Sequence, residues 1–413
     1  MTDLTLRAVS DSDDYDAFAA ASYEVFLQDP RQDEIDLARA FTDYDRMFGF
    51  HDGTRWVSTA GAFGKHVVLP GGGTAPVAAV TAVTVSPSHR RRGLLTAMMR
   101  HQLDDIRVRG TEALAMLYAS ESAIYGRFGY GMAVPVAELS GQVRELGFRP
   151  EAQFGDGSVD HVDAETLMAS APEVHRRVMV QRPGLMERPG PWWGHWIHDS
   201  EERRKEAGKI RFLLHREADG TVSGFAIYRP KNSWTDRGQP NSELQIQEVL
   251  ATNPRAYAQL WRYLLDMDLV RTVVYDGAAV DEPLRSLVAD QRALACQVRD
   301  GIYVRLVDVC RALALRSYAT PVDVVLDVTD EFCPWNTGRW RLRGGPDGAD
   351  CETTTAPGDI AISVRDLGGI YLGAVNLQAL VNAGLVEELT PGSVHRAAIA
   401  FGWPVAPGVP DDF

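Results

Sequence analysis

The sequence predicts a mixed fold in which two tandem α/β units are followed by an α+β unit. Helical and strand patterns alternate over the first 150 residues, and a similar order recurs in weaker form over the next 150. Beyond about residue 300 the pattern changes to strands around turns, with helices between them. A chain of 413 residues, 45% of them hydrophobic, is long enough for several domains. We therefore expect a first unit over 1–150, a second over 151–300 and a third over 301–413.

The first unit is expected to centre on a buried strand that leads into a long helix. The run from Ala75 to Val85 is β-branched and apolar, which is typical of a buried strand. In the helix that follows, Leu94, Met98 and Leu103 share one face, and Gly110 is the expected stop. The predicted elements are helices over 14–27 and 33–48, strands over 55–73 and 75–85, a helix over 93–110, a strand over 112–120 and a short helix over 121–131.

The second unit repeats this order without its basic residues. Its predicted elements are a helix over 164–180, a hairpin over 211–230, a strand over 244–252 and a helix over 253–268. The strand, Pro-containing turn and helix from Val249 to Asp268 match those from Val83 to Leu103, but only Arg255 remains of the basic cluster. If the first copy binds an anionic cofactor, we expect the second to be a structural partner that does not.

The third unit combines strands and helices and ends in a Pro-rich tail. The patterns predict strands over 315–330 and 338–348, a strand and then a helix over 359–373, and a helix over 376–389. The tail runs from Trp403 to Phe413.

Composition limits the partners and the location. The formal net charge is -14, and residues 1–45 hold twelve Asp and Glu against three Arg. This acidity favours a cationic small molecule or a basic peptide and disfavours nucleic acid. The chain lacks an apolar run long enough for a signal peptide or a membrane span, which predicts a cytoplasmic protein without a membrane partner. Export by an unconventional route stays open.

The histidines, cysteines and tryptophans do not predict a metal site. The four cysteines lie late in the chain without a CxxC pair and are expected to be free thiols. His195 and His198 lack a companion carboxylate or cysteine at metal spacing, so we predict no metal. The neighbouring Trp192, Trp193 and Trp196 suit an aromatic wall for a polycation, but a packed domain junction is the favoured interpretation.

The arginines at the strand-to-helix turn predict a phosphate site. The first N–H groups of a helix lack intrahelical partners, and the helix dipole favours an anion there. Arg90, Arg91 and Arg92 add fixed cations, and Gly93 permits close approach of the backbone. No acidic residue lies between Ser86 and His101. The alternatives are a solvated charge run and a structural ion-pair cluster.

At these residues the chain resembles a known family. VTVSPSHRRRGLLTAMM is similar to the acetyl-CoA signature of the GCN5-related N-acetyltransferases (GNATs), and ESAIYGRFGYG to their tyrosine-bearing helix. With the duplicated arrangement and the third unit, the resemblance points to the Eis (enhanced intracellular survival) family of mycobacteria and other actinobacteria. Leu95 replaces the second small residue of the wider superfamily's RxxGxG/A pattern, and the Eis branch shares that departure.

The resemblance implies two tandem GNAT-like domains, the second degenerate, and then a sterol-carrier-protein-like α+β domain that carries the catalytic C-terminus. It also implies a homohexamer that transfers acetyl groups from acetyl-CoA to primary amines, notably at several positions of aminoglycosides. Two classes of alternative stay open: acetylation of protein or peptide lysines by the same fold, and a non-catalytic acyl-CoA sensor.

The family's site residues carry over onto matching positions. Tyr125 matches the general acid, and the α-carboxylate of Phe413 matches the base. The implied acetyl-CoA contacts are Val83, Thr84, Val85, Arg90, Arg91, Arg92, Gly93, Leu94, Leu95, Thr96, Ser120 and Glu121. The implied amine pocket contains Tyr23, Glu24, Phe26 and Asp412.

Overall fold

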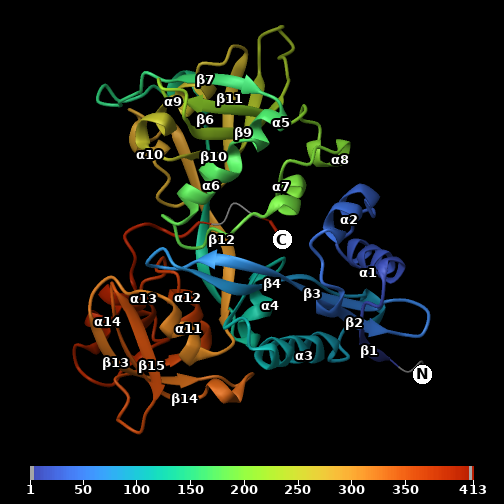
Figure 1. Cartoon of the computed structure of the whole chain (residues 1–413), viewed down its shortest axis with the longest axis vertical. Helices are drawn as coiled ribbons and strands as arrows, with labels where there is room; N and C mark the ends of the chain where they lie inside the picture. Colours follow the sequence, from blue (N-terminus) through green and yellow to red (C-terminus); the bar gives the residue numbers. More distant parts are fainter. Residues whose placement is uncertain (1–3, 409–411) are drawn as a thin grey trace.

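The computed structural model describes residues 4–408 and 412–413 (Figure 1). Within them the strands form one twelve-stranded sheet and one five-stranded sheet. The spatial order of the large sheet is β1 (Thr5–Ala8), β2 (Met47–His51), β3 (Ser58–Val68), β4 (Thr74–Val85), β5 (Leu114–Tyr118), β12 (Leu294–Leu306), β6 (Gly131–Gln142), β11 (Val270–Ala279), β10 (Ser242–Ala251), β9 (Val222–Lys231), β8 (Arg211–Arg216) and β7 (Ser158–Val162).

The helices of the two α/β units include the predicted ones, most of them shorter than predicted, together with α7, α8 and α10, which were not predicted. They are α1 (Ser12–Val25), α2 (Gln32–Arg39), α3 (Leu94–Arg109) and α4 (Ser122–Tyr125) in the first unit, and α5 (Ala164–Met168), α6 (Ala171–Met179), α7 (Gly190–Trp196), α8 (Glu201–Arg204), α9 (Pro254–Leu265) and α10 (Leu284–Leu287) in the second.

Two predicted helices were too long, because a competing local structure interrupts each. The helix expected over 33–48 ends at Arg39, and the residues from Met47 onward form β2 between β1 and β3. The helix expected over 164–180 divides into α5 and α6, with Pro172 in the first turn of α6, where a proline is tolerated.

The two α/β units share their central strands. β6 pairs with β12 from Leu294 to Val304, and from Ile302 onward β12 also pairs on its other side with β5 of the first unit. β6 in turn pairs with β11 of the second unit. Figure 1 shows β12 running from the upper lobe into the lower part of the molecule. The last strand of the second unit therefore completes the sheet of the first, and the domain boundaries near residues 150 and 300 stay predictions.

The third unit is an α+β layer that packs against the first. Its sheet has the order β15 (Gly348–Thr353), β14 (Gly338–Gly345), β13 (Val322–Thr329), β16 (Ile360–Ser363) and β17 (Glu387–Glu388). Its helices are α11 (Val309–Leu315), α12 (Val364–Ile370), α13 (Leu377–Asn382) and α14 (Ser393–Phe401). The helix expected over 376–389 ends at Asn382, and the Gly384 that follows adopts a φ of +73°.

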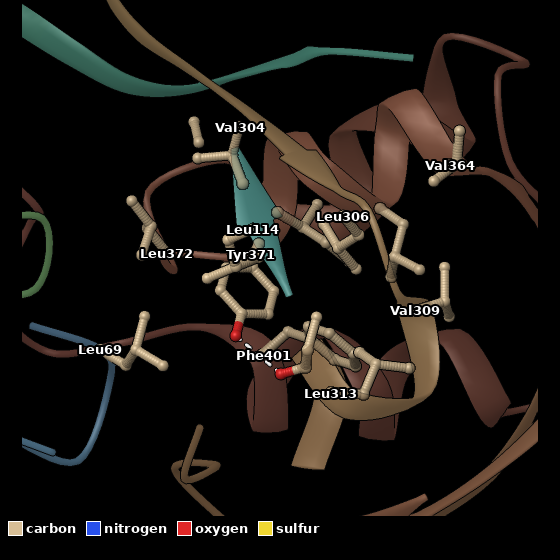
Figure 2. Close-up of a cluster of buried hydrophobic side chains, with 14 of the residues drawn as sticks. Leu69, Leu114, Val304, Leu306, Val309, Leu313, Val364, Tyr371, Leu372 and Phe401 are labelled. Atoms are coloured by element: carbon tan, nitrogen blue, oxygen red, sulfur yellow. Dashed lines mark hydrogen bonds between the residues drawn. The ribbon is translucent and has the colours of Figure 1, made fainter. Parts of the chain in front are cut away.

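One apolar core joins the first and third units. Figure 2 shows side chains of β5, β12 and the loop after β3 directed toward those of the third unit, including Leu114, Val304, Leu69, Tyr371 and Phe401. The Tyr371 hydroxyl donates to the carbonyl oxygen of Ala312 over 2.7 Å, so this buried polar group is satisfied. The third unit is thereby fixed on the sheet that carries the site, and its C-terminal tail leaves from a rigid base.

None of the helices in the described part of the chain has the length and apolar composition needed to cross a membrane.

Candidate active site

A cavity of about 500 Å³ opens where β4 and β5 separate. The two strands pair in parallel from Val77 to Ala79 and no further. The ends of both strands then line the cavity, together with α1, α2, α7 and the last two residues of the chain. We call this cavity the first cleft. An apolar cavity with a few converging polar groups is the usual form of a small-molecule site.

A local distortion of β4 separates the strands. Ala82 has a φ of +52°, which is rare for a residue with a Cβ. The register between β3 and β4 shifts beside it, and the Thr59 hydroxyl donates to the Ala82 carbonyl oxygen over 2.6 Å. The bend turns the edge of β4 away from β5, so its backbone groups face the first cleft. Val83 lines this cleft, whereas the side chain of Thr84 is buried on the opposite side against Thr59.

The predicted phosphate loop lies at the start of α3. Arg90, Arg91, Arg92 and Gly93 are exposed, and the φ angles of Arg91 and Gly93 are +61° and +80°. Within the described residues, α3 has no side-chain cap, so the N–H groups of its first turn are available to a ligand. Three cations, an uncapped helix and left-handed backbone turns together suit a pyrophosphate.

The remaining predicted cofactor contacts divide between the loop and the cleft. Ser120 lines the first cleft, and Glu121 is exposed at the start of α4. Leu94, the first residue of α3, is buried, Leu95 is half-buried, and Thr96 is exposed in the first turn. Of this set, Leu94 can offer only its backbone to a ligand. The open strand edge and the phosphate loop thus fit the two halves of an acyl-CoA molecule.

Tyr125 ends α4 and faces the first cleft. Its side chain is only 5% exposed, and burial raises the pKa of Tyr125 to about 12, with a smaller contribution from the Glu121 carboxylate. The phenol therefore remains protonated at neutral pH and can donate a hydrogen. A tyrosine of this kind suits a general acid at a leaving group.

The C-terminus of the chain enters the same cleft. Asp412 and Phe413 both line it, and the ring of Phe413 lies 5.3 Å from that of Tyr118 between centroids. The C-terminal α-carboxylate is therefore carried into a largely apolar cavity that also holds Tyr125. An α-carboxyl group has an ordinary pKa of about 3.5, so it can accept a proton at neutral pH.

The amine side of the cleft differs from the prediction in one residue. Tyr23 and Phe26 line it, but Glu24 is exposed and does not belong to the described lining, because one step along a helix turns a side chain by about 100°. The carboxylate in the wall comes instead from Glu34 of α2, which is 5% exposed. Tyr23 donates to Glu34 over 3.2 Å.

Two arginines neutralise Glu34. Arg203 of α8 donates through Nε to Glu34 over 2.6 Å, and Arg31 forms a second ion pair with it. Sequence reasoning missed this cluster because Arg203 lies almost 170 residues beyond Glu34 and no local pattern links them. The cleft is consequently less acidic than the composition of α1 and α2 suggests.

The tryptophan-rich segment lies between the first cleft and the core of the second unit. Trp192 of α7 lines the cleft and stacks on Phe41 at 4.0 Å between centroids, while Trp193 is buried within the second unit. His195 also lines the cleft, and burial, assisted by Arg203, lowers the pKa of His195 to about 4. The second unit thus supplies one wall of a cleft that belongs mainly to the first.

Among the residues that the structure describes, no three or more His, Cys, Asp or Glu side chains come together in a group that could hold a metal ion.

Three family models match the chain in succession. Residues 5–133 and 184–306 each match an acetyltransferase (GNAT) domain, and residues 309–410 match a sterol carrier protein domain. The predicted fold class is therefore confirmed.

Relatives match over most of their length. The chain is 43% identical to an uncharacterized N-acetyltransferase of Streptomyces avermitilis over 92% of both chains. It is 31% identical to N-acetyltransferase Eis of Mycobacterium tuberculosis over 86% of this chain and 85% of that one. It also resembles the crystal structure of Eis1 from Mycobacterium abscessus, with a TM-score of 0.83, 30% identity and full coverage of both chains.

Proposed function

Because the chain belongs to the Eis family of GCN5-related N-acetyltransferases, we propose that it transfers acetyl groups from acetyl-CoA to primary amines, including those of aminoglycosides, by direct transfer in a ternary complex. The observation that carries this proposal is the meeting of Tyr125 and the chain terminus in one cleft at the open edge of β4. Acyl-CoA use follows from the family, and acetyl as the acyl group is part of the proposal.

Two groups of residues are proposed to bind two different parts of the cofactor. Arg90, Arg91 and Arg92, with the first N–H groups of α3, hold the pyrophosphate, and the backbone of Val83 to Val85 holds the pantetheine arm. An extended arm beside β4 continues the sheet by strand-like hydrogen bonds. The reacting thioester is then directed to the part of the cleft that Tyr125 lines.

Two residues account for the proton transfers of the proposed reaction. The amine nitrogen forms the new bond to the carbonyl carbon as the C–S bond breaks. The Phe413 carboxylate accepts the proton that the nitrogen loses, and Tyr125 gives its hydrogen to the departing sulfur, to be replaced from solvent. Backbone N–H groups of the bent β4 polarise the carbonyl. Holding both reactants in one cleft supplies much of the rate enhancement.

A lysine of a protein or peptide is a second candidate acceptor. The observation that favours it is the pairing of Glu34 with Arg31 and Arg203, which reduces the attraction of the cleft for a polycation. A single lysine side chain needs less negative charge than an aminoglycoside. Asp412, which also lines the cleft, is a further carboxylate beside the terminus.

The decisive experiment measures free-thiol release from acetyl-CoA against aminoglycosides, polyamines and lysine peptides, with each product weighed by mass spectrometry. Several acetyl groups on one aminoglycoside would support the first candidate. Acetylation of peptides alone would favour the second. Acetyl-CoA binding without turnover of any acceptor would contradict both and leave a sensor.

Assembly and location are part of the same proposal. We expect a homohexamer, which light scattering coupled to size-exclusion chromatography measures directly, and a cytoplasmic site of action.

A further inference from the structure

The second unit contains a cleft at the position equivalent to the first. β10 and β11 pair in parallel as far as Ile246 and Tyr275, and β10 then follows only β9. Between the separated ends lies a cavity of about 520 Å³. We call it the second cleft. The parallel pairing of β4 and β5 ends in the same way at the first cleft.

The C-terminal tail crosses the second cleft before it reaches the first. Val405 and Gly408 line the second cleft, whereas Asp412 and Phe413 line the first. In Figure 1 the C-terminus lies at the centre of the molecule, near α7 and between the two lobes. The described residues of the tail thus lie at both clefts.

Two charged side chains of the second unit hold the tail at Ala406. Arg182, just beyond α6, donates through Nη1 to the Ala406 carbonyl oxygen over 2.5 Å and to Asp281 over 2.6 Å. The other oxygen of Asp281 accepts the Ala406 N–H over 2.9 Å. Both backbone groups of Ala406 are therefore bonded to one ion pair, which we call the tail clamp.

The segment beside the tail clamp ties the tail to the first unit. The Gly408 N–H donates to the Pro183 carbonyl oxygen over 3.0 Å. One residue later, the Gly184 N–H donates to Val68 of β3 over 2.8 Å. Gly184 has a φ of +86°, and a Cβ on it would lie 2.9 Å from the Gly408 carbonyl oxygen. The approach is close enough that a larger residue would displace the tail.

From this geometry we infer that the degenerate second unit is the anchor of the catalytic tail, and that Arg182 and Asp281 are positioning residues that set where the Phe413 carboxylate stands. The inference rests on the proposed function, in which that carboxylate is the base. The clamp fixes the tail at Ala406, seven residues before the terminus, so that only a short segment is left to place the base.

The test compares Asp281→Ala and Arg182→Ala with the wild-type full-length chain. We expect kcat to fall about tenfold or more in each variant, because small misplacement of a reacting group is costly. The KM for acetyl-CoA should change less than about twofold, because the arginine loop is untouched. Loss of the positioned base should also make kcat depend more steeply on pH between about pH 6 and pH 9. Arg182→Lys, which keeps one donor, should restore part of kcat.

Hydrogen exchange provides a readout that does not depend on the chemistry. The amides of Ala406 and Gly408 should exchange faster in the Asp281→Ala and Arg182→Ala variants than in the wild type, while those of α3 keep their rates. Glu173→Ala is the matched control, because it removes an exposed ion pair with Arg176 on α6 of the same unit. It should alter neither kcat nor exchange of the tail.

The possible outcomes distinguish a failure of the positioning role from a failure of the proposed acetyltransferase function. Faster exchange of the tail with unchanged kcat would overturn the positioning role and leave the acetyltransferase function intact. Unchanged exchange in both variants would overturn the anchor itself. Absence of acetyl transfer by the wild type to any acceptor would overturn the proposed function, and the positioning role with it.

Discussion

The two clefts have the same strand geometry and different chemistry. In the first unit an uncapped helix and three arginines follow the bent strand, and a short helix carries Tyr125. In the second unit the equivalent helix α9 is capped by its own Asn253, whose side chain accepts from the N–H groups of Arg255 and Ala256. An N-terminus whose amides are already bonded has little left for a phosphate.

The difference extends to the short helices that follow each cleft. α4 reads SAIY and ends in the proposed acid, whereas α10 reads LRSL and holds no tyrosine. In both α/β units a cleft lies where two parallel strands part, β4 and β5 in the first and β10 and β11 in the second. A few residues at its edge decide whether the cleft takes a ligand or, as we infer for the second, a segment of its own chain.

The largest expected effect comes from removing the Tyr125 hydroxyl at the end of α4, which has no counterpart on α10. Tyr125→Phe should lower kcat by about 10²–10³-fold, the usual contribution of a general acid, with little change in KM for acetyl-CoA. Thiol release over a range of pH measures it. Tyr263→Phe, which removes a hydroxyl from α9 of the second unit, is the matched control. Full turnover by Tyr125→Phe at every pH would show that the two clefts do not differ in this way.

The second prediction concerns the tail whose described residues lie at both clefts. Two residues added beyond Phe413 should lower kcat by roughly 10²-fold, because they replace the α-carboxylate in the first cleft with an amide. The same two residues added before Met1 are the control, since β1, the first strand of the chain, lies at the edge of the large sheet and does not belong to the described lining of the cleft (Figure 1). Normal activity of the extended chain would remove the terminal base from the mechanism.

The third prediction compares the two helix N-termini. Arg91→Ala and Arg92→Ala should each raise the KM for acetyl-CoA by about tenfold, as expected for one lost charge-assisted contact at an exposed site, and leave kcat nearly unchanged. The effect should weaken as salt is added. Arg255→Ala, at the start of α9, should have no effect on KM. An equal rise in the KM for acetyl-CoA in all three variants would mean that the loop does not bind the phosphates.

Much of this comparison could be predicted from the sequence, because its signals are local. The strand from Ala75, the arginine loop and the helix ending at Gly110 follow from periodicity and from glycine and cap signals within a few residues. The repeat was visible for the same reason. The roles of Tyr125 and Phe413 came from family resemblance and stay predictions.

The rest depends on contacts between distant parts of the chain. The placement of β12 between β5 and β6 depends on strand pairing across some 180 residues, and no local pattern encodes it. Likewise, the ion pairs of Glu34 with Arg203 and of Arg182 with Asp281 form only after the units have packed. The family resemblance implies Glu24 in the amine pocket, but one step along α1 from Tyr23 turns its side chain out of the described lining.

The last and smallest predicted effect distinguishes the carboxylates of the two clefts. Glu34 in the first cleft is ion-paired, whereas Glu282 lines the second and its Oε1 has no hydrogen-bond partner among the described residues. Burial raises the pKa of Glu282 to about 7. A carboxyl group with a raised pKa binds its proton more tightly in the folded chain. Its contribution to stability is therefore complete below the unfolded pKa and is lost as the pH rises toward about 7.

Glu282→Gln should remove that dependence. Between about pH 5 and pH 8 the wild type should lose up to about 3 kcal/mol of unfolding free energy relative to the variant, which corresponds to roughly 3 °C in Tm for a chain of this length. Calorimetric melting at several pH values measures the difference, and the exposed Glu165→Gln is the control. Parallel Tm profiles for the wild type and Glu282→Gln would mean that the second cleft holds its carboxylate in water or against a partner. Glu282 of the second cleft would then be as well paired as Glu34 of the first.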